Sequence, residues 1–187
     1  MTENLIANIL QDLKTKSLAH FQMKYTGWYL LGGPAQADDS DISYKTDVLS
    51  PSELNKLVAQ TQRMLPFEPL QSGSELEMLS HFLFEIRKKP TNAFSGWISV
   101  GRAVNNDIVL RYPTISKLHA RFEVETTAFG DPIGYRLIDN NSTGKTAING
   151  VVLTENQAVP VSIGDSILFG NIRCSVTDAS LLWESLR

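Results

Sequence analysis

The chain has 187 residues, of which 42% are apolar and 20% charged, a composition typical of one globular domain with an appendage. Its net charge of -3 gives no electrostatic indication of binding to nucleic acid or to a membrane surface. The single cysteine, Cys174, excludes an intrachain disulfide and a thiolate zinc cluster, and the histidines have no metal-ligand spacing. Composition and spacing therefore predict no metal and no cofactor.

Residues 2–23 place apolar side chains at mostly helical spacing and predict an amphipathic helix. Because this segment contains acidic residues, we expect neither a signal peptide nor a membrane anchor. No apolar run approaches the ~20 residues that a transmembrane helix needs. The expected location is the cytoplasm.

The rest of the N-terminal region combines linkers with a second helix. The apolar run GWYLLGG is followed by GGPAQADDSD, which has the composition of an acidic, turn-rich linker. Residues 50–65 predict a helix, with Ser50 as N-cap, Pro51 at the first helical position and Glu53 completing a capping box. Residues 1–75 are therefore interpreted as a helical segment of unknown function, whose apolar faces we expect to pack against the rest of the chain.

From about residue 76 the hydrophobic pattern changes from helical to alternating. Short runs rich in β-branched and aromatic residues are separated by glycine, asparagine, aspartate and proline. In HARFEVET, for example, Ala120, Phe122 and Val124 alternate with charged residues. The pattern predicts an all-β sandwich over residues 76–180, followed by a tail or short helix at 181–187.

The stretch STGKT, residues 142–146, matches the end of a nucleotide-binding P-loop. The position of the first P-loop glycine is occupied by Asp139, an acid that is unsuited to a phosphate-binding nest of backbone amides. After Thr146 the sequence AINGVVL predicts a strand and a turn where the P-loop requires a helix. We therefore exclude nucleotide binding by this stretch.

Four motifs occur in a fixed order, namely Gly101-Arg102 with NNDIVL, then ISKLHA, then DNNSTGKTAING, then IGDSILFG. Together with the strand pattern between them, they resemble the forkhead-associated (FHA) domain, a phosphothreonine-peptide-binding module. The resemblance implies a sandwich of two antiparallel sheets with about eleven short strands, whose loops at one end hold the peptide. It also implies a signalling adaptor or scaffold downstream of a Ser/Thr kinase, and no enzyme.

A phosphothreonine receptor must offer hydrogen-bond donors, because the phosphate carries about -1.5 to -2 charge and three acceptor oxygens. Arg102 offers a planar fork of donors at the exit of a strand. The resemblance assigns phosphopeptide contacts to this arginine and to Ser116, Lys117 and Thr143 of the next two loops. Lys145 is a further candidate because of its charge, although it departs from the family. The alternatives are an ion pair between Arg102 and Asp107, and a merely solvated side chain for Lys117.

A second set of residues is expected to shape the loops rather than to contact the ligand: Gly101, Asn106, His119, Asn149 and Gly150. In the family, the residue that matches His119 holds the phosphate loop through ring hydrogen bonds. We assign His119 no acid–base role, because neither a nucleophile nor a triad lies near it in sequence. Asn106 is expected in a turn before a strand, and Asn149-Gly150 forms a second turn.

The chain departs from the family at Gly144-Lys145, where FHA domains have Asn-Gly. Glycine has no side-chain donor, so the peptide clamp made by that asparagine is lost, at about 0.5–1.5 kcal/mol. Lys145 would be strained if this position requires a positive φ, but its charge could compensate near the phosphate. Two interpretations stay open: a modified phosphothreonine reader, and a phosphate-independent scaffold.

The expected partner is a phosphothreonine-containing protein or Ser/Thr kinase substrate, and neither nucleic acid nor a membrane. Within the chain, Thr46 in YKTDVL precedes Leu49 by three residues and is a candidate ligand in cis. If a kinase phosphorylated Thr46, this segment could occupy the domain's own site and prevent partner binding. The sequence leaves the oligomeric state open.

Overall fold

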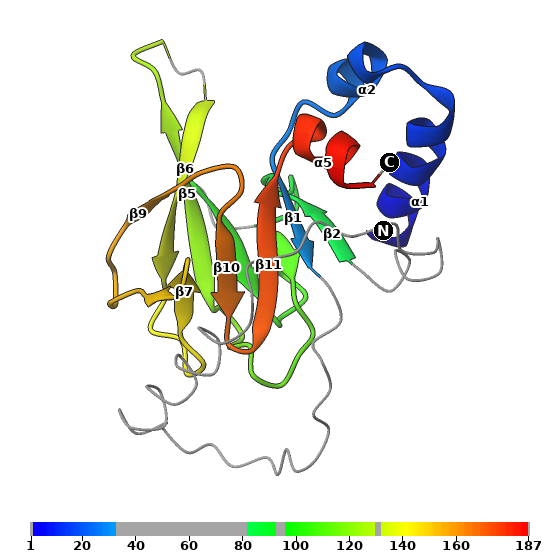
Figure 1. Cartoon of the computed structure of the whole chain (residues 1–187). Coiled ribbons are helices and arrows are strands. Elements are labelled where there is room, and N and C mark those ends of the chain that lie inside the picture. The colour runs from blue at the N-terminus through cyan, green and yellow to red at the C-terminus, as the bar shows by residue number, and fades with distance from the viewer. Residues whose placement is uncertain (1, 33–81, 93–95, 130–131, 187) are drawn as a thin grey trace.

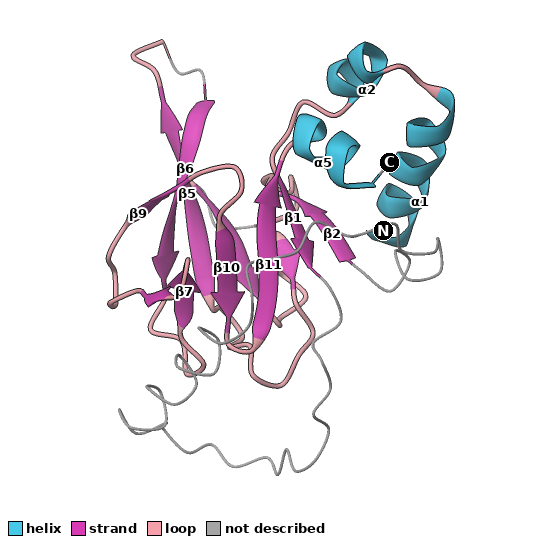
Figure 2. Cartoon of the chain, in the orientation of Figure 1, coloured by secondary structure: helices cyan, strands magenta, loops and turns pink. Residues whose placement is uncertain are grey.

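The computed structural model describes residues 2–32, 82–92, 96–129 and 132–186 (Figure 1). Two β-sheets face each other, and helices pack beside one of them (Figure 2). The helix expected at 50–65 and the candidate cis ligand Thr46 lie outside the described residues.

One sheet is six-stranded, with the order β2-β1-β11-β10-β7-β8 and antiparallel pairing between neighbours. Its strands are β1 (Tyr29–Gly32), β2 (Phe82–Glu85), β7 (Thr146–Ile148), β8 (Val151–Val152), β10 (Ser166–Phe169) and β11 (Ile172–Thr177).

The other sheet is five-stranded, with the order β4-β3-β5-β6-β9. Its strands are β3 (Trp97–Gly101), β4 (Ile108–Val109), β5 (Ala120–Thr126), β6 (Pro132–Asp139) and β9 (Val159–Val161). Strand β4 pairs parallel to β3, and the other pairs are antiparallel. The predicted two-sheet β-sandwich is confirmed.

The main core lies between the sheets and is formed largely by residues at alternate positions of the strands, together with loop residues such as Leu110 and Ile115. In β5, Ala120 and Phe122 are both 0% exposed, as the alternation predicts. Val124, two residues further on, is 39% exposed. The tip of the β5–β6 hairpin projects beyond the six-stranded sheet (Figure 1), so the described strands of that sheet do not extend over β5 toward the tip.

Strand β1 is buried on both faces and joins two cores. Leu30 packs in the core between the sheets, whereas Tyr29 and Leu31 pack in a second core with the helices. This run was predicted to belong to the N-terminal helical segment, but it is a strand of the sandwich. A strand with two covered faces is apolar throughout, so it lacks the alternation that marked the other strands.

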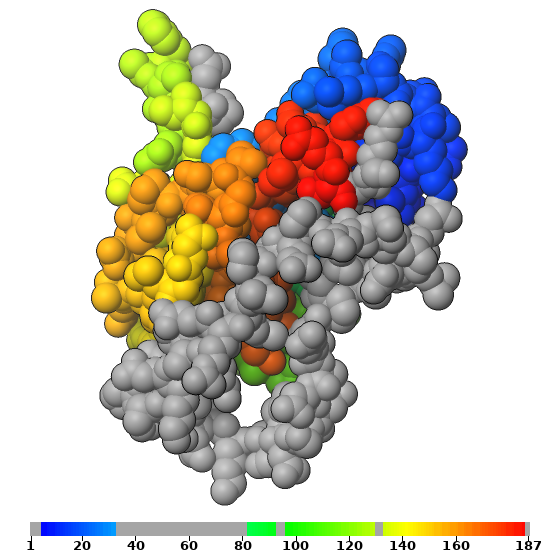
Figure 3. Space-filling model, in the orientation of Figure 1, coloured from blue at the N-terminus to red at the C-terminus, as the bar shows by residue number. Residues whose placement is uncertain are grey.

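The second core is built by helices from both ends of the described chain, namely α1 (Thr2–Thr15), α2 (Leu18–Lys24) and α5 (Ala179–Leu186). Figure 3 shows the N-terminal helices in direct contact with the C-terminal one. Phe21 of α2 packs against Trp183 of α5, with ring centroids 5.4 Å apart. The predicted short C-terminal helix is therefore present.

The helical pattern of residues 2–23 is divided between two helices, not one. Ser17 ends the first segment and caps α2, since its side chain accepts a hydrogen bond from the His20 amide at 3.4 Å. The two helices are connected through Asp12, which accepts hydrogen bonds from Lys24 Nζ at 2.5 Å and from the Tyr25 hydroxyl at 2.9 Å.

Candidate functional site

Three loops meet at the end of the sandwich away from the β5–β6 hairpin tip. The first follows β3, the second connects β4 to β5 and carries Ser116, and the third follows β6. Ser116 joins them. Its carbonyl oxygen accepts a hydrogen bond from the amide of Arg102, in the loop after β3, at 3.0 Å. Its hydroxyl oxygen accepts one from the amide of Thr143, in the loop after β6, at 3.1 Å. The Ser116 hydroxyl proton has no acceptor among the described residues, so it is available to a ligand.

His119 connects the same loops from inside the protein, where it is 0% exposed. Its Nδ1 accepts the Ser116 amide proton at 3.0 Å, so Nε2 carries the ring proton and donates to the Lys145 carbonyl at 3.1 Å. Burial lowers the pKa of His119, although the bond to the Lys145 carbonyl acts in the opposite direction. The ring is therefore a neutral connector between the loops that carry Ser116 and Lys145.

Arg102 and Lys117 are exposed beside Ser116. Within the described ranges, no acidic side chain pairs with either of them. The alternative ion pair between Arg102 and Asp107 is not formed, because Asp107 pairs with Lys88 at 3.1 Å. Both cationic groups are thus free to meet an anionic ligand.

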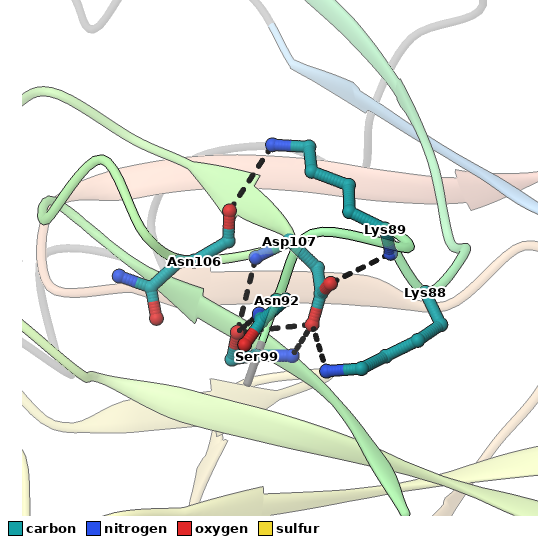
Figure 4. Close-up of polar contacts among 6 residues, drawn as sticks. All are labelled: Lys88, Lys89, Asn92, Ser99, Asn106 and Asp107. Atoms are coloured by element: carbon teal, nitrogen blue, oxygen red, sulfur yellow. Dashed lines mark hydrogen bonds and ion pairs between the residues drawn. The ribbon is translucent and has the colours of Figure 1, made fainter. Parts of the chain in front are cut away.

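Asp107 organises the back of the first loop (Figure 4). Its carboxylate accepts hydrogen bonds from the Ser99 amide at 2.7 Å, the Ser99 hydroxyl at 3.0 Å and the Lys89 amide at 2.7 Å. Burial raises the pKa of Asp107, but the hydrogen bonds from Ser99, Lys89 and Lys88 outweigh it and hold that pKa below its usual value. The loop is therefore fixed by a buried, fully bonded carboxylate.

Gly101 and Asn106 bring the first two loops close together. A Cβ atom at Gly101 would lie 2.4 Å from the carbonyl oxygen of Lys117, so only glycine fits at this position. The Asn106 side-chain amide donates to the carbonyls of Lys117 at 2.7 Å and Ala103 at 2.8 Å. Both residues therefore lie against the backbone of the loop that carries Lys117.

Asp139, the acid that excluded a P-loop, shapes the third loop. Its carboxylate accepts hydrogen bonds from the Ser142 amide at 2.9 Å, and from the hydroxyls of Ser142 and Thr146 at 2.6 Å each. Sequence analysis did not assign this role. An aspartate followed three residues later by a serine was the available signal, because aspartate side chains often bond backbone amides in turns.

At Gly144 there is no space for a side chain, and at Lys145 the backbone has a conformation that is unfavourable for residues other than glycine. A Cβ atom at Gly144 would lie 2.6 Å from the carbonyl oxygen of Thr114 and 3.0 Å from Cα of Gly170. Lys145 has φ +60°, in the left-handed region where glycine is favoured. The positive φ that was expected to strain a lysine at this position is therefore present at Lys145.

Asn149 and Gly150 form the turn between β7 and β8, with φ values of +50° and +82°. Positive φ at both central residues is typical of a tight hairpin turn with Asn-Gly. The Asn149 side chain donates to Asp165 at 2.8 Å and accepts from the Ser166 amide at 2.9 Å. It is bonded within the protein rather than directed to a ligand.

A groove extends from Arg102 along the loop that follows β4, and sequence analysis did not find it. It is lined by Arg102, Val104, Arg111, Tyr112 and Pro113. It therefore presents two guanidinium groups beside apolar side chains. Arg102 and Arg111 belong to different loops and come together only through the folding of those loops, so no pattern in the sequence predicts their proximity.

The parts of the chain that the structure describes contain no cluster of three or more potential metal ligands. None of the helices in these parts is both long and apolar enough to span a membrane.

Comparison with known proteins identifies the central part of the chain. Residues 98–170 match the family model of the FHA domain, and no curated protein matches the chain. The similar solved structures include a chain from a study of phosphothreonine-dependent FHA domain interactions. That chain is 21% identical with a TM-score of 0.40, and the similarity covers 51% of this chain and 82% of that one.

Two other solved structures give similar values. The FHA domain of MEK1 in complex with a HOP1 phosphothreonine peptide is 22% identical with a TM-score of 0.40, and the similarity covers 46% of this chain and 84% of that one. The FHA domain of an Arabidopsis thaliana hypothetical protein is 26% identical with a TM-score of 0.41, covering 51% of this chain and 73% of that one.

The sandwich and its cluster of loops define a class of proteins in which rigid sheets present a binding site on loops. Within that class, the match over residues 98–170 identifies an FHA domain, a non-catalytic binding module, in this part of the chain.

Proposed function

We propose that this protein binds phosphothreonine-containing segments of partner proteins and acts as an adaptor or scaffold for the substrates of a Ser/Thr kinase. One observation carries the proposal. Ser116 fixes three loops through its carbonyl, its amide and its hydroxyl oxygen, and keeps its own hydroxyl proton for a ligand. The family supports the same conclusion, since the FHA domain is usually a phosphothreonine-binding module.

The chemistry of the surrounding side chains is that of a receptor for a dianion. Arg102 offers a fork of donors, Lys117 a point charge and Ser116 a hydroxyl, and charge-assisted hydrogen bonds of this kind are the strongest. Thr143 and Lys145, on the third loop, are proposed to add a hydroxyl and a second ammonium group. None of these side chains has an acidic partner in the described part of the chain.

The groove beside Arg102 suggests which residues flank the phosphothreonine. Arg111 favours an acidic side chain, whereas Val104, Tyr112 and Pro113 favour an apolar one. A positional scan of phosphothreonine peptides is therefore expected to select acidic or apolar residues at the positions that reach this groove.

A second candidate function is a scaffold that no longer depends on phosphate. Gly144 favours it, because this position offers no side-chain donor and has no space for one. The two functions differ in one measurable property, namely whether binding requires the phosphate.

The test is calorimetric titration of the full chain with a degenerate pool of phosphothreonine peptides, and with the same pool in unphosphorylated and phosphoserine form. We expect binding to the phosphothreonine pool alone. Arg102→Ala is expected to weaken it about tenfold to a hundredfold, because a charge-assisted hydrogen bond is lost. Arg87→Ala, which removes an exposed arginine paired with Glu85 on β2, is the matched control. Equal binding to the unphosphorylated pool would favour the phosphate-independent scaffold instead.

A further inference from the structure

The turn between β10 and β11 packs against the third loop of the candidate site. The Gly170 amide donates to the Lys145 carbonyl at 2.9 Å. The Thr114 hydroxyl, from the loop after β4, donates to Oδ1 of Asn171. Gly170, with φ +59°, allows this approach, since a Cβ atom there would lie 2.9 Å from the Thr114 carbonyl oxygen. The turn is therefore part of the wall of the site.

This packing explains why position 144 is a glycine. A Cβ atom at Gly144 would lie 2.6 Å from the Thr114 carbonyl oxygen and 3.0 Å from Cα of Gly170. Both atoms belong to the backbone, so neither can move aside without moving its segment. The volume that a side chain at position 144 would need is occupied by the segments that carry Thr114 and Asn171.

Asn171, in the turn between β10 and β11, carries side-chain N–H donors that no described residue accepts. Its Oδ1 is the acceptor for the Thr114 hydroxyl, so its Nδ2 group keeps two N–H donors. The residue is exposed, and its Nδ2 group has no acceptor among the residues that the structure describes. The bond from Thr114 fixes the plane of the carboxamide, and this reduces the entropy lost when Nδ2 binds a ligand.

We propose that Asn171 is a ligand-binding residue whose Nδ2 group donates to a main-chain carbonyl of the bound phosphothreonine peptide, at the place where Gly144 provides no donor. This inference rests on the proposed function. Thr114 is a positioning residue, since it holds the carboxamide through Oδ1. Because the acceptor belongs to the peptide main chain, the contact adds affinity for a peptide without selecting its sequence.

The test compares two probes on the full chain, namely a single phosphothreonine peptide taken from the degenerate pool and inorganic phosphate, which has no carbonyl. Asn171→Ala is expected to weaken peptide binding about three- to tenfold, the effect of one hydrogen bond, and to leave phosphate binding unchanged. Arg102→Ala weakens both. Gln11→Ala, which removes an exposed carboxamide from α1, is the matched control and changes neither.

Two further variants test the mechanism. Thr114→Val removes the hydroxyl that orients Asn171 and is expected to weaken peptide binding by no more than Asn171→Ala does. The double variant should bind as Asn171→Ala alone, because both changes act on one contact. Gly144→Asn in the Asn171→Ala background should not restore binding, since the new Cβ atom has no space. The amide NMR spectrum of each variant shows whether it is folded.

Peptide binding by Asn171→Ala at the affinity of the unaltered chain, while Arg102→Ala weakens it as expected, would overturn the role of Asn171 and leave the proposed function intact. Equal weakening of peptide and phosphate binding by Asn171→Ala would also overturn it. Absence of phosphothreonine-dependent binding in the unaltered chain would overturn the proposed function and, with it, this inference.

Discussion

Two buried aspartates hold two loops of the candidate site by different means. Asp107, 3% exposed, accepts hydrogen bonds from two amides, one hydroxyl and the ammonium group of Lys88. Asp139, 0% exposed, accepts bonds from one amide and two hydroxyls and has no ion-pair partner in the described part of the chain. The first loop is thus held by a charged network, and the third by hydrogen bonds to neutral groups.

The two aspartates differ in whether the groups that donate to them can reorient. Amide and ammonium groups only donate, so the residue at position 107 must present acceptors on both sides of its carboxyl group. Hydroxyl groups rotate and can also accept, so Ser142 and Thr146 can adapt to another group at position 139. We therefore expect negative charge to be required at Asp107 and dispensable at Asp139.

The largest effect is expected for Asp107→Asn, which should lower the free energy of unfolding by about 3 kcal/mol. The new NH2 group would face either the Lys89 amide or the donors of Ser99 and Lys88, all of which are already donating. Urea denaturation of the variant and the unaltered chain measures this loss. A loss below that of Asp139→Asn would contradict the comparison.

Mild acid should weaken the hydrogen bonds of the neutral His119 ring before it weakens those of the Asp107 carboxylate. Because burial lowers the pKa of His119 in the folded protein, the stability from its neutral ring is complete above the unfolded pKa of about 6.5. That stability is lost as the pH falls through the lowered folded pKa, with a slope of at most about 1.4 kcal/mol per pH unit.

The contribution of Asp107 has a lower pH window, since its folded pKa lies below its usual value. It is complete above the unfolded pKa of about 3.9 and is lost as the pH falls through the folded value. Urea denaturation between pH 7 and pH 5 therefore reports on His119, and His119→Gln should flatten the slope. An unchanged slope in that variant would assign the pH dependence to other groups.

Asp139→Asn should lower the free energy of unfolding by only about 1 kcal/mol. Its carbonyl can still accept from the Ser142 amide, while its NH2 group donates to the rotated hydroxyls of Ser142 and Thr146. Thermal unfolding of the two asparagine variants side by side gives the comparison directly. Asp139→Ala, which removes the acceptors altogether, serves as the reference for complete loss.

The smallest effect is a gain. Lys145→Gly relieves the backbone at φ +60° and should raise the free energy of unfolding by about 0.5 kcal/mol, because the greater freedom of glycine in the unfolded chain offsets part of the relief. Urea denaturation at pH 7 measures it. A loss of stability would show that the lysine side chain contributes packing that exceeds the strain.

The alternating strands could be predicted from sequence because one of their faces is buried and the other solvated, as Ala120 and Phe122 show. Strand β1 could not be predicted in this way, because burial of both of its faces removes the alternation. The break between α1 and α2 at Ser17 could not be predicted either, since the apolar spacing continues through this N-cap residue.

Residues with a distinctive chemistry in an ordered motif could be proposed in advance, such as Arg102, Ser116 and His119, which the structure brings together. Asp107 could not, because its role depends on which segments fold against it, whereas the serine three residues after Asp139 was a local signal for its role. Asn171 lies far along the chain from the other loops and reaches the site only through the packing of β10 and β11.

Strand β1 has a practical consequence for any shortened form of the protein. A fragment that starts near residue 76 would lack the strand that separates β2 from β11. The main-chain donors and acceptors of β11 would then be open along one side, next to the uncovered apolar residues of the helical core. Such an edge pairs with other chains. The fragment would self-associate, and weak peptide binding by it would measure aggregation and not recognition.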